Sequence, residues 1–274
     1  MKTYKRKVLD KEFFIAEHEG EKGPVILIHG LTGNHQNMQH YANKLKGEYQ
    51  VLSVDLLGRG DSDPVDEGTN LMKHGEYMTA LVEEIGSQET ILIGHSMGAY
   101  IASLVASKSD YVKKLILLDG GAQIRKRHDD LIKPALSRIS RQYETRELYI
   151  DEVRKIYDSL GISWNTVIQD SVVHELGQRE SIWKNKSEEG KILKDWESAS
   201  SFKPSEVFSS IACPILLVYA KGEIGPLGTL FSISEYEDVF KNAKDLKMIT
   251  SESNHYTMIF EYREEIMDAI DAFI

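Results

Sequence analysis

The stretch Gly94-His-Ser-Met-Gly98 lies between the apolar run Ile91–Ile93 and a helix-forming segment, Ala99–Ser107. A serine flanked by glycines in a tight turn from strand to helix is raised above the edge of a sheet, where a substrate can reach it. The pentapeptide alone is a weak pattern, but the strand before it and the helix after it make it specific. The stretch therefore indicates an α/β protein with Ser96 as its candidate nucleophile.

Short apolar runs of the same kind recur along the chain, separated by helix-like stretches. The four runs in the first half, 25–28, 51–54, 91–93 and 115–118, are too short for a helix and too continuously apolar for a half-exposed strand, so they predict strands buried on both faces. Two more strands are predicted late in the chain. Alternation of strands and helices predicts a parallel sheet with helices on both faces. The predicted strands are 25–28, 51–54, 91–93, 115–118, 215–219 and 246–250, the predicted helices are 36–45, 71–85, 99–107, 234–240 and 262–273, and residues 4–9 and 12–17 predict an edge hairpin.

Residues 122–210 break this alternation, because they are helix-like throughout and contain no buried-strand run. We expect an insertion there, with a body made of 1–121 and 211–274. All three tryptophans, Trp164, Trp183 and Trp196, lie in the insertion. Since tryptophan is often used where an apolar wall meets a ligand, we expect at least one of them to border the site.

Composition excludes several classes of function. The net charge of −10 over 274 residues disfavours nonspecific nucleic-acid binding. No apolar run approaches the roughly 20 residues of a membrane span. The basic N-terminus is followed at once by Asp10-Lys-Glu12 rather than by the apolar region of a signal peptide, so we expect a cytoplasmic protein. The single cysteine, Cys213, fits a reducing compartment.

Motifs for bound groups are also missing from the sequence. It contains no H-E-x-x-H or C-x-x-C spacing and no phosphate-binding glycine loop, so we expect neither a metal nor a cofactor. The expected partner is a small-molecule substrate. The oligomeric state stays open.

A serine hydroxyl needs a base to remove its proton and a carboxylate to orient that base. His255 follows the last predicted strand and lies at the carboxyl edge of the sheet, where the turn of Ser96 also opens. We therefore expect His255 to be the base. His95 adjoins the serine and is expected to point to the opposite side of the backbone, and a structural role is expected for His29.

Five motifs in this order resemble the α/β-hydrolase superfamily over nearly the full length of the chain. They are His29-Gly-Leu-Thr-Gly33, Asp55-Leu-Leu-Gly-Arg-Gly-Asp-Ser-Asp63, Gly94-His-Ser-Met-Gly98, Leu117-Leu-Asp119 and Asn254-His255. The resemblance implies an eight-stranded, mostly parallel sheet with helices on both faces. It also implies that 122–210 is a helical cap inserted after the sixth strand, closing over a serine hydrolase site.

The same resemblance implies an oxyanion hole. Its donors would be the backbone N–H groups of Met97 and Leu31, with Gly30 keeping the loop close to the substrate. Asp55 and Arg59 are expected to shape a loop at the rim of the site rather than to touch substrate.

Two residues compete for the role of the acid. Most relatives place an aspartate in the loop after the seventh strand, where this chain offers only Glu223. A subset takes the acid from the end of the sixth strand and often shows sequences like Leu118-Asp-Gly-Gly121 and Asn254-His-Tyr-Thr257, both present here. We expect Asp119 to be the acid and keep Glu223 as the alternative.

These features predict a cofactor-free hydrolase of a carboxylic ester, lactone or thioester of a small, largely apolar substrate, acting through an acyl-enzyme. Fold does not fix function, so two alternatives stay open. One is a carbon–carbon bond hydrolase or lyase using the same triad, and the other is a ligand receptor that turns over slowly.

Overall fold

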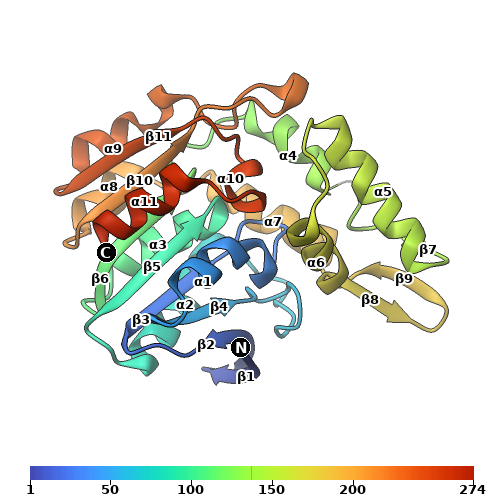
Figure 1. The fold of residues 1–274 in the computed structure, drawn as a ribbon, viewed down its shortest axis with the longest axis horizontal. Helices are drawn as coiled ribbons and strands as arrows, with labels where there is room; N and C mark the ends of the chain where they lie inside the picture. The colour runs from blue at the N-terminus through green and yellow to red at the C-terminus, as the bar shows by residue number, and fades with distance from the viewer. Residues whose placement is uncertain (137) are drawn as a thin grey trace.

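The apolar runs form the strands of a single large sheet in the computed structural model, which describes residues 1–136 and 138–274. The strand order is β1-β2-β4-β3-β5-β6-β10-β11 (Figure 1). The strands are β1 (Lys2–Val8), β2 (Lys11–His18), β3 (Lys22–Ile28), β4 (Tyr49–Val54), β5 (Thr90–His95), β6 (Val112–Leu118), β10 (Ile215–Ala220) and β11 (Leu246–Ser251).

Strand β2 runs antiparallel to both of its neighbours, and the other pairs are parallel. Residues 25–28 of β3 and all of β5 are buried, as expected for strands covered on both faces. The prediction of an eight-stranded, mostly parallel sheet is confirmed.

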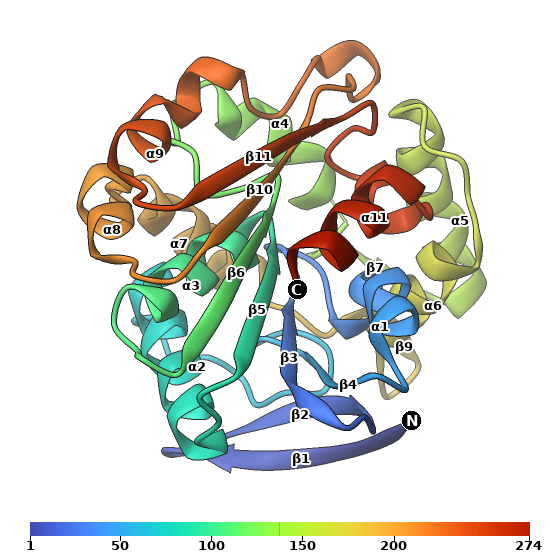
Figure 2. The same ribbon diagram turned by 60° about the vertical axis from the view of Figure 1, so that its left-hand side comes forward.

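Helices cover both faces of this sheet. Helices α1 and α11 lie on one side, and α2, α3, α8 and α9 lie on the other (Figure 2). Sequence sets their ends locally: the Asn70 side chain accepts from Lys73 N at the start of α2, and Gly86 ends that helix with a φ of 70°. The bounds are α1 (Gln39–Leu45), α2 (Leu71–Ile85), α3 (Met97–Ala106), α8 (Pro204–Ser210), α9 (Glu237–Asn242), α10 (Thr257–Phe260) and α11 (Glu264–Phe273), with 3-10 turns η1 (His35–Met38), η2 (Gly225–Leu227) and η3 (Ile233–Tyr236).

The chain between β6 and β10 is mixed in structure, so the expectation of helix throughout 122–210 is wrong. Besides α8 it contains α4 (His128–Leu136), α5 (Arg146–Ser159), α6 (Thr166–His174) and α7 (Glu189–Ala199), with a small sheet of β7 (Gln142–Tyr143), β8 (Leu176–Arg179) and β9 (Ile182–Asn185). These strands are two to four residues long and mostly polar or part-exposed, and so have no apolar pattern to reveal them.

Helix α8 packs on α3 and α9 beside the main sheet, although it lies inside the predicted insertion. The division into a body of 1–121 and 211–274 and a cap of 122–210 stays a prediction. Among the described residues, no helix combines the length and the apolar character needed to cross a membrane.

A buried ion pair joins α7 to the loop after β4. Arg59 Nη1 donates to Asp195 Oδ2 over 2.7 Å, and both side chains are almost fully buried. Asp195 also accepts hydrogen bonds from Thr69 Oγ1 at 2.6 Å and from His74 Nε2 at 3.0 Å. Removing one partner of such a pair leaves an uncompensated buried charge, which costs about 3–5 kcal/mol of folding free energy.

Candidate active site

Ser96 occupies a strained turn between β5 and α3. Its backbone has a φ of 53° and a ψ of −120°, a left-handed conformation that costs energy in a residue other than glycine. The two flanking positions must be glycine because neighbouring backbone atoms leave no room for a side chain. A Cβ on Gly98 would lie 2.1 Å from Ile28 O, and a Cβ on Gly94 would lie 2.3 Å from Gly98 O. The turn therefore lifts the serine side chain above the sheet while packing its backbone tightly underneath.

His255 lies in the turn between β11 and α10. The Asn254 side chain shapes this turn, because its Oδ1 accepts from the backbone N–H groups of Tyr256 at 3.0 Å and Thr257 at 2.9 Å. The imidazole is buried, and its Nδ1 lies 2.7 Å from Oδ2 of Asp119. The turn thus brings an imidazole from the end of the chain to a carboxylate at the end of β6.

The Asp119 side chain is fully buried, and its other carboxylate oxygen also accepts hydrogen bonds. Oδ1 accepts from Ala220 N at 3.3 Å and from the Tyr236 hydroxyl at 3.4 Å. Burial and the nearby Asp119 carboxylate raise the pKa of Tyr236 well above its ordinary value, so the phenol stays a neutral donor. The carboxylate is therefore fixed in orientation with Oδ2 directed at the imidazole.

Glu223 lies elsewhere. Its side chain is exposed, and in the part of the chain that the structure describes its carboxylate makes no hydrogen bond to His255. Its backbone carbonyl accepts from Asn254 Nδ2 at 3.1 Å, which supports the turn before the histidine. The structure brings Asp119 to the imidazole and leaves Glu223 at the surface.

Ser96 and His255 line one cavity, which together with its open mouth holds about 880 Å³. Among the described hydrogen bonds there is none from Ser96 Oγ to His255, and such contacts are often loose before a substrate binds. Leu31, Met97 and Gly30 border the same cavity, and a Cβ on Gly30 would lie only 3.0 Å from Ser96 Cβ. Most of the remaining lining is apolar or aromatic, including Ile124, Leu131, Tyr157, Leu230, Phe231 and Ile259.

Hydrogen bonds to its backbone carbonyls fix the loop that carries Leu31. Arg59 Nε donates to Leu31 O over 3.0 Å, so the residue that pairs with α7 also holds this loop. His29 Nε2 accepts from Leu56 N at 3.0 Å, and its Nδ1 donates to Gly30 O at 2.7 Å. Burial lowers the pKa of His29 to about 3, so the ring is neutral and can make both bonds.

His95 is close to the site, and the expectation that it points away is wrong. Its ring packs 4.6 Å from the His255 ring, centroid to centroid, and its Nε2 donates to His255 O over 2.9 Å. Burial first, and then the charge of His255, lower the pKa of His95 well below its ordinary value, so the ring stays neutral. The left-handed turn at Ser96 ends the alternation of the strand, and sequence alone offers no signal for this contact.

The three tryptophans differ in position. Trp196 of α7 borders the cavity, and its Nε1 donates to Asp129 Oδ1 over 2.8 Å. Trp164 and Trp183 are not part of the cavity wall; Trp164 instead packs against Tyr157 and lies under the guanidinium of Arg154.

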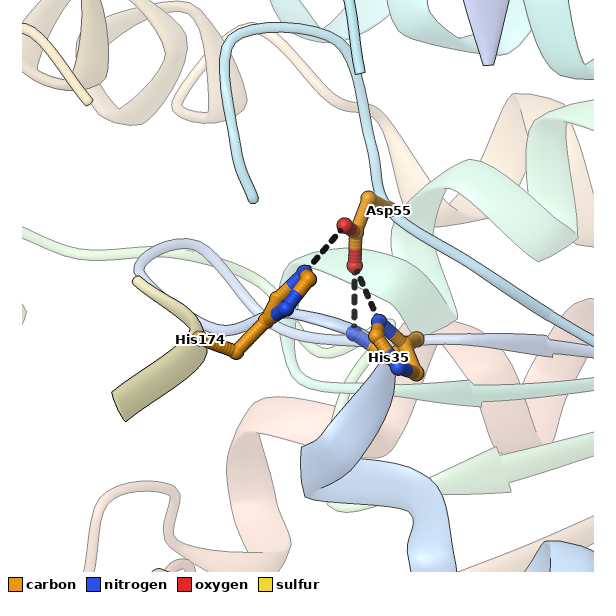
Figure 3. Close-up of side chains that lie close together, drawn as sticks. All are labelled: His35, Asp55 and His174. Carbon is orange, nitrogen blue, oxygen red and sulfur yellow. Dashed lines mark hydrogen bonds and ion pairs between the residues drawn. The ribbon is translucent and has the colours of Figure 1, made fainter. Parts of the chain in front are cut away.

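A second polar cluster lies outside the cavity lining. His35, Asp55 and His174 each offer a ligand atom, and these atoms lie within 4.8 Å of one another (Figure 3). Among the described residues, this is the one group of three histidine, cysteine, aspartate or glutamate side chains close enough together to hold a metal ion.

Comparison with known proteins gives one family match and several relatives. A family model described as alpha/beta hydrolase fold matches residues 23–262. The chain is 31% identical to esterase YbfF of Escherichia coli over 110 residues, which is 38% of this chain and 41% of that protein. It is 28% identical to 2-(acetamidomethylene)succinate hydrolase of Mesorhizobium japonicum over 103 residues, 37% of each chain. The aligned regions thus span about two fifths of these curated relatives.

Solved structures extend the likeness over the whole chain. A crystal structure of E-2-(acetamidomethylene)succinate hydrolase superposes with a TM-score of 0.85 at 18% identity, covering 99% of both chains. At this identity the likeness concerns the fold alone.

Proposed function

The chain belongs to the alpha/beta hydrolase fold family, and from this membership we propose that it is a cofactor-free serine hydrolase. Its substrate would be a carboxylic ester, lactone or thioester of a small, largely apolar molecule. The observation that carries the proposal is the 2.7 Å contact between His255 Nδ1 and Asp119 Oδ2 at a cavity also lined by Ser96. The esterase among the relatives favours ester chemistry.

The reaction would proceed in two halves. Ser96 Oγ attacks the acyl carbonyl while His255 Nε2 takes its proton and then delivers it to the leaving oxygen. Asp119 keeps the proton of the resting imidazole on Nδ1 and stabilises the imidazolium that forms. Water then repeats the sequence on the acyl-enzyme and releases the acid.

The developing oxyanion would be bound by the backbone N–H groups of Met97 and Leu31. Met97 is the first residue of α3, where N–H groups lack partners within the helix and the helix dipole favours negative charge. Arg59 stabilises the position of Leu31 through the hydrogen bond to its carbonyl. Donors fixed before the reaction supply a large share of the rate enhancement in acyl transfer.

The cavity wall favours an uncharged acyl group. Its one guanidinium, from Arg138, is bound by both oxygens of Glu175 at 3.0 and 2.9 Å, and the hydroxyl of Tyr149 donates to the same carboxylate. The charge of Arg138 is therefore compensated within the protein. The apolar residues that make up most of the wall would bind a small acyl or alcohol group.

Short esters provide the test of this proposal. We expect p-nitrophenyl acetate and butyrate to be hydrolysed, and the palmitate ester to be a poor substrate because the proposed acyl group is small. Turnover is measured by release of p-nitrophenol, with a fluorophosphonate-treated sample as the control. Absence of turnover on every ester, or a preference for the palmitate ester, would contradict the proposal.

Trp196 should report on cavity occupancy. We expect Trp196→Phe to raise KM for short esters several-fold, because it removes part of the wall, and to abolish the fluorescence change caused by a slow substrate. Trp164→Phe and Trp183→Phe are the matched controls and should change neither KM nor the fluorescence response. Equal effects of all three substitutions would mean that the tryptophans act through packing of this part of the fold.

A further inference from the structure

The cluster of His35, Asp55 and His174 joins three distant parts of the chain (Figure 3). His35 begins the turn η1, Asp55 follows β4, and His174 ends α6. His35 Nδ1 lies 2.8 Å from Asp55 Oδ1, and His174 Nε2 lies 2.7 Å from Asp55 Oδ2. Two imidazoles therefore face the two oxygens of one carboxylate.

Asp55 is a fully buried charge. Burial alone would raise its pKa, but the hydrogen bonds from His174 and His35 outweigh that effect and hold the pKa of Asp55 well below its ordinary value. Its remaining hydrogen bonds come from the backbone N–H groups of His35 and Asp61. Among the described ion pairs, Asp55 has no lysine or arginine partner. Hydrogen bonds thus satisfy the buried carboxylate, and a cation at this position would add the charge compensation that buried carboxylates ordinarily receive.

The donor set matches a particular kind of cation. Two imidazole nitrogens and a carboxylate are ligands typical of zinc and neighbouring transition metals, whereas magnesium and calcium prefer oxygen ligands alone. We propose that His35 Nδ1, His174 Nε2 and the Asp55 carboxylate bind one divalent ion of the zinc class. On binding, the proton that each neutral ring now donates to the carboxylate would move to its other nitrogen by exchange with solvent, and the nitrogen freed in this way would ligate the ion.

Surrounding groups hold the two rings in place. Phe14 packs against both imidazoles, with centroid distances of 5.1 Å to His35 and 5.6 Å to His174. Asp61 Oδ2 lies 3.8 Å from the other ring nitrogen of His174, and Lys186 Nζ binds both Asp61 and the backbone carbonyl of His174. A carboxylate beside the second nitrogen of a ligating histidine is a common outer-shell arrangement.

Solvent has a path to this position. Gly60 lies against the cluster, because a Cβ on it would be 2.0 Å from Asp55 Oδ2 and 2.8 Å from His174 Nε2. Together with Asp61 and Lys186, Gly60 also lines a surface cavity, and the His174 side chain is 14% exposed. An ion could therefore enter and keep a water molecule in its remaining coordination position.

The position of the cluster suggests a structural effect. Ser171 of α6 accepts a hydrogen bond from Asn34 and donates one to Asn37, and Ser171 and Asn37 both line the cavity of Ser96. An ion bound by His35 and His174 would fix α6 against η1 directly behind this wall. The inference does not rest on the proposed hydrolase function, because the ion itself contacts neither Ser96 nor His255.

Zinc binding by the full-length chain tests the inference. After treatment with a chelator, titration calorimetry with zinc chloride should show one ion bound per chain, and thermal melting should show a rise in Tm with zinc. Loss of an outer-shell partner weakens metal binding by about 10- to 100-fold, so His174→Gln or Asp55→Asn, which removes a direct ligand, should weaken it by about 100-fold or more. His18→Gln and Cys213→Ser are matched controls and should bind zinc as the unmodified chain does.

Two results would overturn the proposal. One is an unmodified chain whose Tm does not change with zinc, which would mean that hydrogen bonds alone satisfy the buried carboxylate; this result needs no variant to fold. The other is zinc binding that His174→Gln leaves unchanged, which would place the ion at an unrelated surface position. A cobalt absorption spectrum of the unmodified chain, lost in His35→Gln, would independently support ligation by imidazole.

Discussion

Ester hydrolysis by Ser96→Ala is expected to fall by about 10⁴- to 10⁶-fold in kcat, because the variant has no oxygen to form the acyl-enzyme. Any residual rate would come from substrate binding and from the N–H groups of Leu31 and Met97, which the substitution leaves in place. The measurement is steady-state turnover of p-nitrophenyl butyrate, with labelling by a fluorophosphonate followed by peptide mass spectrometry. The label should be found on Ser96 in the unmodified chain and be absent from the variant.

Ser209→Ala is the matched control for this experiment. Ser209 is exposed on α8, and among the described residues its hydroxyl bonds only to Glu206 O in the same helix, so it should be dispensable. Full activity of Ser96→Ala, or a label on a different residue of the unmodified chain, would refute Ser96 as the nucleophile. Circular dichroism and Tm should be nearly unchanged in Ser96→Ala, and relief of the strained turn is not expected, since alanine also disfavours a φ of 53°.

Asp119→Asn is expected to lower kcat by about 10⁴-fold while leaving KM nearly unchanged. The amide keeps the shape of the carboxylate but loses its charge, so it no longer stabilises the imidazolium and no longer selects the tautomer with the proton on Nδ1. Glu223→Gln is the matched control, because it makes the same chemical change in an exposed side chain. That variant should retain nearly full activity.

The pair of variants separates the two candidate acids. A large loss of kcat in Glu223→Gln together with a small loss in Asp119→Asn would make Glu223 the acid instead of Asp119. Similar moderate losses would mean that both carboxylates reach His255 when substrate is bound. The Tm of each variant must be measured alongside, since Asp119 also accepts hydrogen bonds from Ala220 and Tyr236 inside the protein.

Strands β3, β5, β6 and β10 of the main sheet could be predicted because each contains a continuous apolar run, a pattern that burial on both faces imposes on sequence. The small sheet of β7, β8 and β9 could not, since its polar or part-exposed residues carry no such pattern. The observed ends of helix α2 match the predicted range 71–85, and the structure gives the reason: the Asn70 side chain caps its first turn and Gly86 ends it. Residue patterns therefore predict the elements in which burial dictates the residue type.

Contacts between distant segments were harder to predict. The positions of Ser96 and His255 follow from the edge of the sheet at which their strands end, and Asp119 follows from the end of β6. The contact of His95 with His255 depends on how one turn directs a side chain. The cluster of His35, Asp55 and His174 depends on where α6 packs, so no spacing along the sequence predicts it.

The ion pair between Arg59 and Asp195 bears on the modularity of the fold. A shortened chain that joined β6 directly to β10 would keep every strand of the main sheet but would lose α7, and with it the only carboxylate paired with Arg59 among the described residues. The guanidinium would then face either solvent or an apolar interior, and Leu31 would lose a fixed neighbour. Such a shortened chain is therefore expected to melt at a lower temperature than the full chain, even though its main sheet is complete.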